Sequence, residues 1–171
     1  SRIKGLRIKN SLTQKNIAEC LNISIAAYSQ FERMEILIPI ELLNKLANYY
    51  HVSLDYLLKI SDDPNIDVVN FDIDKKQVGE NLKKIRKELK LYQETLALEV
   101  GTSHSLISEY ESGKKLVSLT YGYAICKKYH ISLDYLYGKV KHPYNLGCFT
   151  LKCILSKSIY FLFFFFFFIF F

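Results

Sequence analysis

The side chains best placed to recognise another molecule lie on one short stretch, residues 104–112. Its apolar residues fall three or four positions apart, so on a helix they share one face: Leu106, Ile107 and Tyr110. The polar residues left on the outer face are His104, Ser105, Ser108 and Glu109. A short helix with small hydrogen-bonding groups on its free face is suited to the major groove of duplex DNA.

The residues around this stretch predict how it is positioned. Residues 93–100 form a second short helix pattern, and Gly101 can turn the chain because glycine adopts a positive φ without steric cost. Ser103 can cap the following helix by accepting a hydrogen bond from a backbone N–H. Gly113 is a typical residue for the end of that helix. The sequence therefore predicts a helix, a tight turn and a second helix.

The chain matches itself without a gap when it is shifted by 79 residues. Arg7 falls on Arg86 and Gln14 on Gln93, and residues 50–57 (YHVSLDYL) fall on residues 129–136 (YHISLDYL). Such a register predicts two copies of one fold. We call residues 1–60 copy one and residues 78–140 copy two, and we expect about five short helices in each.

Residues 61–77 form an acidic linker between the copies, and its last residues are expected to begin the first helix of copy two. The segment 61–79 has two Lys/Arg and five Asp/Glu, whereas residues 80–142 have eleven Lys/Arg and seven Asp/Glu. The basic blocks on either side of the linker favour a polyanionic partner, although the excess of positive charge is modest.

The spacing of residues in the two copies resembles that of a known family. The motif Q-x-x-x-A, then S-x-x-x-I-S-x-Y-E-x-G-K, then SLDYL is similar to the phage repressor/Cro-type, or XRE-like, helix-turn-helix family. The resemblance covers nearly all of residues 1–60 and 78–138. It implies an all-α protein with two tandem five-helix lambda-repressor-like DNA-binding domains, whose third helices lie in the major groove.

The resemblance also implies a DNA-binding role for named residues. In the family, the Gln that opens helix two contacts a phosphate, which maps to Gln93 and Gln14. The first two residues of helix three contact base edges, which maps to His104 and Ser105, and a third position maps to Glu109. The full set of predicted DNA-binding residues is Gln93, Ser103, His104, Ser105, Ser108, Glu109 and Lys114 in copy two, with Gln14, Ser24, Ile25, Ala26 and Gln30 in copy one.

Copy one departs from the pattern at its third helix. Ile25 and Ala26 stand where copy two has His104 and Ser105. These apolar side chains can touch thymine methyl groups but provide no hydrogen-bond code. Residues 34–40 (MEILIPI) are also unusually apolar for a loop, and Met34 replaces Gly113, so the usual helix stop is missing. We therefore expect a homodimer or a protein partner to bind through copy one, or the two copies to pair on one DNA site.

Several other residues favour a structural role. Arg7 and Arg86 are expected to pair with Glu32 and Glu111, because both members recur at matching positions in the two copies. Cys20 and Cys126 are expected in the core, and Gly122 is expected to weaken its helix by about 1 kcal/mol relative to alanine and to lose packing. Cys148 and Cys153 have no second Cys/His pair beside them, so no zinc site is predicted.

Residues 141–171 form a low-complexity tail rich in phenylalanine. Its uninterrupted apolar part, residues 159–171, is shorter than the ~20 residues that a membrane span needs. We favour translated sequence beyond a damaged gene end, with contact to a membrane or to a partner as less favoured alternatives. The absence of an N-terminal signal peptide predicts a cytoplasmic protein.

Taken together, the sequence predicts a transcriptional regulator, and more specifically a repressor, that binds double-stranded DNA sequence-specifically. The alternative is a protein-interaction or antitoxin-like module that uses the same scaffold. No Gly-rich phosphate loop, nucleophile motif or metal cluster is present in the sequence. We therefore expect no catalytic residues, no cofactor, no bound metal and no enzyme activity.

Overall fold

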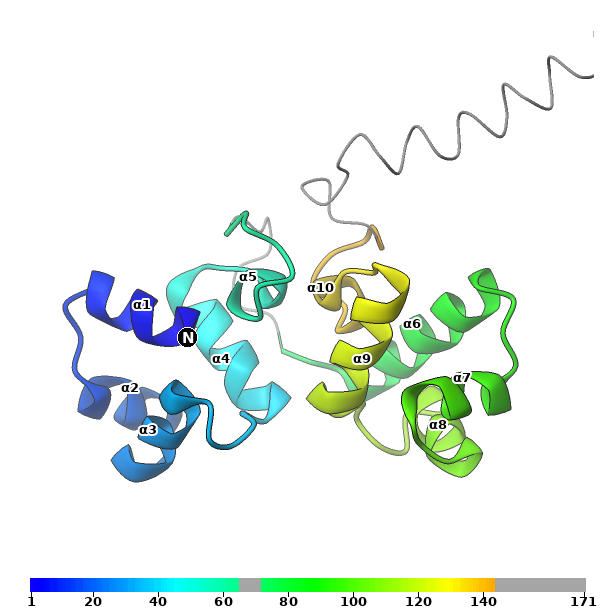
Figure 1. The fold of residues 1–171 in the computed structure, drawn as a ribbon, viewed down its shortest axis with the longest axis horizontal. Coiled ribbons are helices and arrows are strands. Elements are labelled where there is room, and N and C mark those ends of the chain that lie inside the picture. Colours follow the sequence, from blue (N-terminus) through cyan, green and yellow to red (C-terminus); the bar gives the residue numbers. More distant parts are fainter. Residues whose placement is uncertain (65–71, 144–171) are drawn as a thin grey trace, which may run out of the picture.

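A computed structural model describes residues 1–64 and 72–143, and within these ranges the chain contains ten helices and no strand. Figure 1 shows the helices divided between the two sides of a central boundary. Copy one contains α1 (Arg2–Lys9), α2 (Gln14–Leu21), α3 (Ile25–Arg33), α4 (Ile40–Tyr50) and α5 (Leu54–Leu57). Copy two contains α6 (Lys75–Glu88), α7 (Gln93–Val100), α8 (His104–Glu111), α9 (Leu119–Tyr129) and α10 (Leu133–Leu136). The predicted all-α tandem fold is confirmed.

Helix α6 begins inside the segment predicted as a linker. Its first residue is Lys75, and Asp74 caps it by accepting a 3.0 Å hydrogen bond from the Lys76 amide. The prediction that the last linker residues begin this helix is confirmed.

Apolar residues at helical spacing fill the centre of each copy. Leu21, Leu46 and Leu54 are completely or almost completely buried in copy one. Leu82 and Ile107 are completely buried in copy two. Burial of such side chains contributes about 1.5–3 kcal/mol each, which makes this packing the main source of stability.

The prediction for the cysteines is half wrong. Cys126 is buried in the core, but Cys20 lies on the exposed side of α2. The helical pattern alone did not distinguish these positions. Cys148, Cys153 and the phenylalanine-rich end of the tail lie outside the described residues. Among the described residues, no helix is long and apolar enough to cross a membrane.

The missing glycine does not prevent α3 from ending. Met34 adopts the left-handed conformation, with φ 62°, that Gly113 adopts with φ 69° after α8. The Met34 amide donates to the carbonyl of Phe31, which closes the last turn. The left-handed region costs roughly 1–2 kcal/mol for a residue with a Cβ atom, so copy one makes the same turn at a higher conformational cost.

Gly122 is required by its surroundings, which corrects the prediction that its packing is lost. A Cβ atom at this position would lie 2.6 Å from the Tyr137 hydroxyl oxygen and 3.3 Å from Leu136 Cδ2. The buried Tyr137 hydroxyl donates a 3.0 Å hydrogen bond to the Val117 carbonyl. The matching positions in copy one are Leu43 and Leu58, so one copy uses two leucines where the other uses glycine and tyrosine.

The two copies meet through reciprocal hydrogen bonds between α5 and α10. Asp134 of α10 accepts bonds from the amides of Leu54 (2.9 Å) and Asp55 (3.0 Å) at the start of α5. In return, Asp55 accepts bonds from the Leu133 amide (2.8 Å) and the Ser132 hydroxyl (2.6 Å) at the start of α10. Asp134 lies in the first turn of α10, yet its carboxylate satisfies the N-terminal amides of the other copy.

We predict that Gly122→Ala lowers the free energy of unfolding by about 1–3 kcal/mol, because the added methyl group overlaps the Tyr137 hydroxyl. Gly5→Ala is the matched control, since a Cβ atom on this glycine of α1 meets nothing within 4 Å. That control should raise the free energy of unfolding by up to about 1 kcal/mol. Urea denaturation measures both, and equal stabilisation by the two substitutions would contradict the packing described for Gly122.

We also predict that the chain loses stability as the pH rises toward 7. Burial and the nearby Asp55 carboxylate raise the pKa of Asp134 to about 7 despite its amide hydrogen bonds and the Lys139 charge, which lower it. A raised pKa in the folded state means that the contribution of Asp134 is fully present below its ordinary pKa of 3.8 and is lost as the pH rises through about 7.

The free energy of unfolding is expected to fall by up to about 1.4 kcal/mol per pH unit between pH 5 and pH 7. Urea denaturation at a series of pH values measures it. The variant Asp134→Asn cannot ionise and should lose this slope, although it can satisfy only one of the two amides. A wild-type chain whose stability rises from pH 5 to pH 7 would contradict the assignment.

Candidate nucleic-acid interface

The turn between α7 and α8 has the geometry expected from its residue types. Gly101 ends α7 with φ 71°, and its amide bonds to the carbonyls of Ala97 and Leu98. Ser103 then adopts an extended conformation, and its hydroxyl accepts a 3.2 Å bond from the Leu106 amide. The buried side of α8 includes Ile107, Tyr110 and Glu111, so the opposite side of the helix is left free.

Copy one forms the same turn with different residues. Asn22 takes the left-handed conformation of Gly101, with φ 55°, which suits asparagine better than most other residues. Ser24 caps α3 by accepting a 3.1 Å bond from the Ala27 amide. The helix-turn-helix geometry is therefore present in both copies.

A buried ion pair ties α8 to the first helix of its copy. Arg86 donates from Nε to Glu111 Oε1 (2.5 Å) and from Nη2 to Glu111 Oε2 (2.9 Å), and from Nη1 to the Leu91 carbonyl (2.8 Å). Gln93, the first residue of α7, donates to Glu111 Oε2 at 2.7 Å. One carboxylate thus joins α6, α7 and α8, and the pairing predicted from the recurrence of both residues is confirmed.

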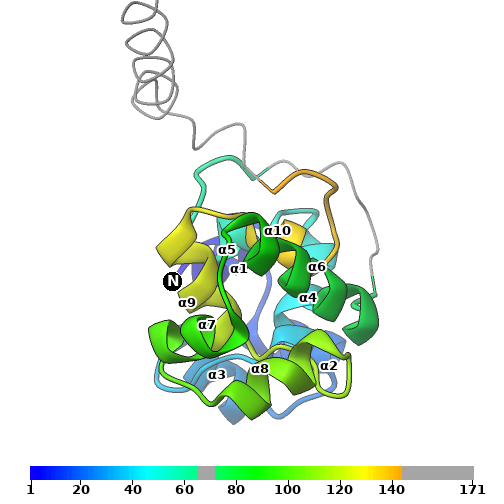
Figure 2. The same cartoon turned by 90° about the vertical axis from the view of Figure 1, so that its right-hand side faces the viewer.

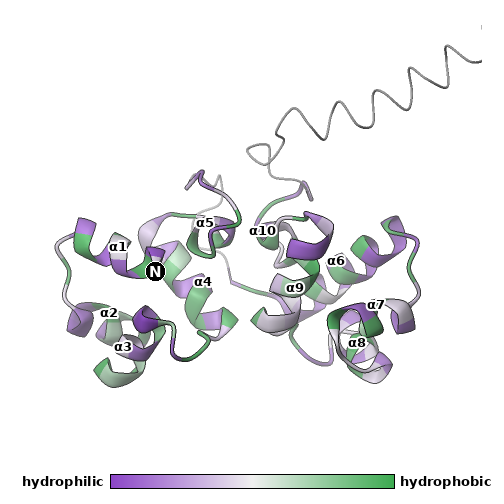
Figure 3. Cartoon of the chain, viewed as in Figure 1, coloured by the Kyte–Doolittle hydropathy of each residue, from purple (hydrophilic) through white to green (hydrophobic). Residues whose placement is uncertain are grey.

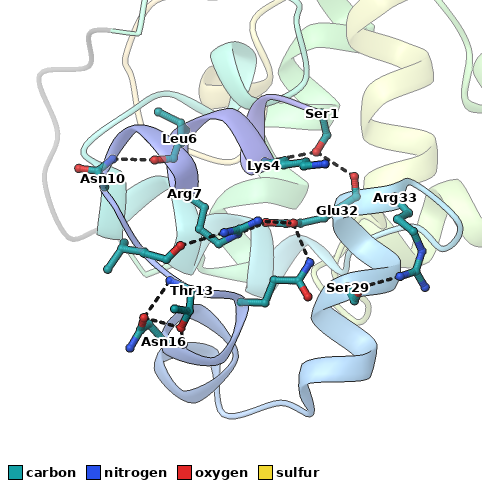
Figure 4. A network of polar contacts seen from close by, with 12 residues as sticks. Ser1, Lys4, Leu6, Arg7, Asn10, Thr13, Asn16, Ser29, Glu32 and Arg33 are labelled. Carbon is teal, nitrogen blue, oxygen red and sulfur yellow. Dashed lines mark hydrogen bonds and ion pairs between the residues drawn. The ribbon is translucent and has the colours of Figure 1, made fainter.

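The same network holds copy one together (Figure 4). Arg7 donates to both carboxylate oxygens of Glu32, at 2.6 and 3.1 Å, and to the Leu12 carbonyl at 2.8 Å. Gln14 donates to Glu32 at 2.9 Å. Burial raises the pKa of Glu32, but the hydrogen bonds from Arg7 and Gln14 and the positive charge of Arg7 outweigh it, so the pKa is lowered overall. The ion pair therefore stays charged at neutral pH.

Gln14 and Gln93 each keep one N–H with which they could contact a phosphate, as predicted for them. Each uses one amide hydrogen on the buried glutamate, and a primary amide has two. Gln93 and Gln14 are also only partly buried. One N–H of each side chain is thus left for another acceptor, such as a phosphate oxygen.

Most polar residues predicted for copy two lie at the surface. His104, Ser105, Ser108, Ser103 and Lys114 are all exposed on or beside α8. Glu109 is half-buried, and its carboxylate forms a 2.8 Å ion pair with Lys115. The structure therefore gathers these residues on or beside α8. It also pairs Glu109 with Lys115, a contact that the sequence pattern did not predict.

The corresponding surface of copy one is less polar. Ile25 is 48% exposed, and Ser24 and Ala26 are also exposed, while Gln30 is half-buried. Figure 3 shows hydrophobic colour at the free tip of α3. Near the other end of this helix, Arg33 bonds Ser29 (2.6 Å) and Glu35 (2.7 Å), a cluster that the motif comparison did not identify.

The helices α3 and α8 lie on the same side of the molecule. Figure 1 shows both at the lower edge, one on each side of the central boundary, and the view turned by 90° in Figure 2 also places both there. The surface that carries the predicted residues is therefore shared by the two copies. Within the described ranges, no cluster of three His, Cys, Asp or Glu residues could hold a metal ion.

Known proteins share this sequence pattern. A family model described as "Helix-turn-helix" (HTH_3) matches residues 3–57 and again residues 82–136. An uncharacterised HTH-type transcriptional regulator, YobD, of Bacillus subtilis (strain 168) is 36% identical over 64 residues, which are 37% of this chain and 57% of that protein. An uncharacterised transcriptional regulator in the ATPase CF(0) region of Rhodospirillum rubrum is 34% identical over 64 residues, 37% of this chain and 59% of its own.

Solved structures match over comparable lengths. The restriction-modification controller protein C.AhdI from Aeromonas hydrophila is 30% identical, with a TM-score of 0.35, covering 37% of this chain and 96% of that one. A transcriptional regulator from Listeria innocua is 24% identical, with a TM-score of 0.36, covering 48% of this chain and 77% of that one. The match to the two curated bacterial relatives spans a little more than half of their length. The two matches of the family model, which together cover more than half of the chain, show that it belongs to the XRE-like helix-turn-helix (HTH_3) family and carries two copies in tandem.

Proposed function

We propose that this chain is a transcriptional repressor that binds double-stranded DNA sequence-specifically, with α8 as a recognition helix in the major groove. The observation that carries the proposal is that the polar side of α8 is exposed while the buried Arg86–Glu111 pair holds the opposite side of the helix. A rigid helix with free hydrogen-bonding groups can contact base edges without a large ordering cost. Occupancy of a promoter by such a protein would exclude polymerase.

Each polar residue has a distinct role in this proposal. His104 and Ser105 open α8 and can donate to or accept from base edges. Gln93 offers its remaining N–H to a phosphate, which positions the domain rather than supplying much affinity. Lys114 is exposed and supplies counterion release. Glu109 forms an ion pair with Lys115, so in this proposal it orients the Lys115 ammonium group.

A second candidate function is binding to a protein through copy one. Its support is a group of exposed apolar side chains on one copy, which are Ile25 (48% exposed), Met34 (75%), Ile36 (45%) and Leu37 (60%). Exposed apolar residues in one region often mark a protein interface. Salt separates the two candidates, because phosphate-driven binding weakens steeply between about 50 and 200 mM salt and an apolar interface does not.

We predict that in vitro selection from random duplex DNA, with the full chain at near-physiological salt, enriches a defined motif. The double variant His104→Ala/Ser105→Ala should lose that motif, because it removes the hydrogen-bonding groups at the start of α8. Both side chains are exposed, so the thermal unfolding midpoint should stay within about 2 °C of the wild type and serves as the control for folding. Enrichment of the same motif by the variant would contradict α8 as the reader. A folded wild type that enriches nothing would favour the protein-binding candidate.

A further inference from the structure

A buried lysine joins the two copies on one side of their boundary. Lys139 follows α10 and is only 2% exposed. Its ammonium group donates to Asn44 Oδ1 and to Asn48 Oδ1, each at 3.0 Å, and both asparagines belong to α4 of copy one. A buried ammonium group is costly unless it is hydrogen-bonded, so copy two depends on copy one to satisfy this residue.

The opposite side of the boundary has different chemistry. The 79-residue register pairs Lys139 with Ile60, Asn44 with Tyr123 and Asn48 with Lys127. One groove between the copies is lined by Ile60, Tyr123 and Lys127. These are the residues that correspond to Lys139, Asn44 and Asn48 when the two copies are interchanged. The boundary thus has an approximate twofold arrangement with a polar contact on one side and a largely apolar one on the other.

This difference selects which copies can pair. If copy two paired with a second copy two, Lys139 would face Tyr123 and Lys127, and two ammonium groups would be brought together. If copy one paired with a second copy one, Asn44 and Asn48 would face Ile60, which offers no hydrogen-bond donor. Like charges disfavour the pairing of copy two with a second copy two, and loss of the Lys139 bonds to Asn44 and Asn48 disfavours the pairing of copy one with a second copy one. The pairing of copy one with copy two avoids both costs.

The reciprocal bonds of Asp55 and Asp134 then fix how the copies are oriented. Each carboxylate bonds the start of the short helix in the other copy, and this pairing leaves α3 and α8 on the same side of the molecule (Figures 1 and 2). Because the copies belong to one chain, the effective concentration of each for the other exceeds that of a second molecule.

We propose that a single chain binds DNA through two recognition helices, α3 and α8, and that its target is a duplex with two unequal half-sites. In this proposal, Lys139 selects the pairing of copy one with copy two. This inference rests on the proposed DNA-binding function. The half-sites are unequal because α3 offers Ile25 and Ala26, which suit thymine methyl groups, whereas α8 offers His104 and Ser105. A homodimer through copy one, in contrast, requires two chains on one site.

Native mass spectrometry of the full chain on the duplex recovered by selection tests the stoichiometry. We expect one chain per duplex and a motif with two different halves. Insertion of five base pairs between the halves rotates one by about half a turn, so we expect binding to weaken at least about tenfold. Two chains per duplex, two identical halves, or indifference to the insertion would overturn the inference while leaving DNA binding intact. Failure to enrich any motif would instead overturn the proposed function, and the inference with it.

The variant Lys139→Met tests the role of the lysine, with Lys141→Met, an exposed lysine two residues further on, as the matched control. Lys139→Met should reduce the penalty for the five-base-pair insertion at least threefold, because the bonds to Asn44 and Asn48 are lost and the copies are held together less firmly, whereas the control should keep the full penalty. Asn48→Leu removes one acceptor from the copy-one side and provides a second test if Lys139→Met fails to fold. An unchanged penalty in a folded variant would show that Lys139 does not set the pairing.

Discussion

The arrangement of this protein depends on one constraint, which is the reciprocal hydrogen bonding of two aspartates between α5 and α10. Asp55 and Asp134 are almost completely buried, and each finds hydrogen-bond donors at the first turn of the other helix. Their mutual repulsion and their desolvation oppose this arrangement, while four donors from two helices favour it. Each carboxylate thus satisfies donors at the start of the helix in the other copy, which favours the two copies in this arrangement.

Within each copy, a second polar network performs a different task. The buried Arg–Glu pairs, Arg7 with Glu32 and Arg86 with Glu111, connect the first helix to the third and leave the outer side of α3 or α8 free. The copies have kept this network while they diverged at the surface and in the core. Leucines in copy one are replaced by the pair Gly122 and Tyr137 in copy two, a change that preserves packing only when both residues change together.

The helices, the tandem repeat and the Arg–Glu pairs could be predicted from the sequence because each rests on local spacing or on recurrence at matched positions. The contact between the copies could not. Asp134 in the first turn of a short helix is typical of a local cap, and only the three-dimensional structure reveals that it bonds the other copy. The motif SLDYL carried the family resemblance, yet it also forms the boundary between the copies. Gly122 was misjudged because helix propensity contains no information about Tyr137. The base contacts proposed for His104 and Ser105 depend on a DNA partner, so neither spacing nor fold defines them.

Amide hydrogen exchange at Leu54 and Leu133 tests the central claim, that the copies cap one another, most directly. The first amide of a helix has no acceptor within that helix, and such an amide ordinarily exchanges rapidly. The account predicts strong protection of both amides, because Asp134 and Asp55 accept their hydrogen bonds across the boundary. It also predicts that Asp134→Ala abolishes the protection of Leu54 while the core amide of Leu46 stays protected. Exchange of Leu54 and Leu133 at the rate of an unstructured peptide in the wild-type chain would contradict the account.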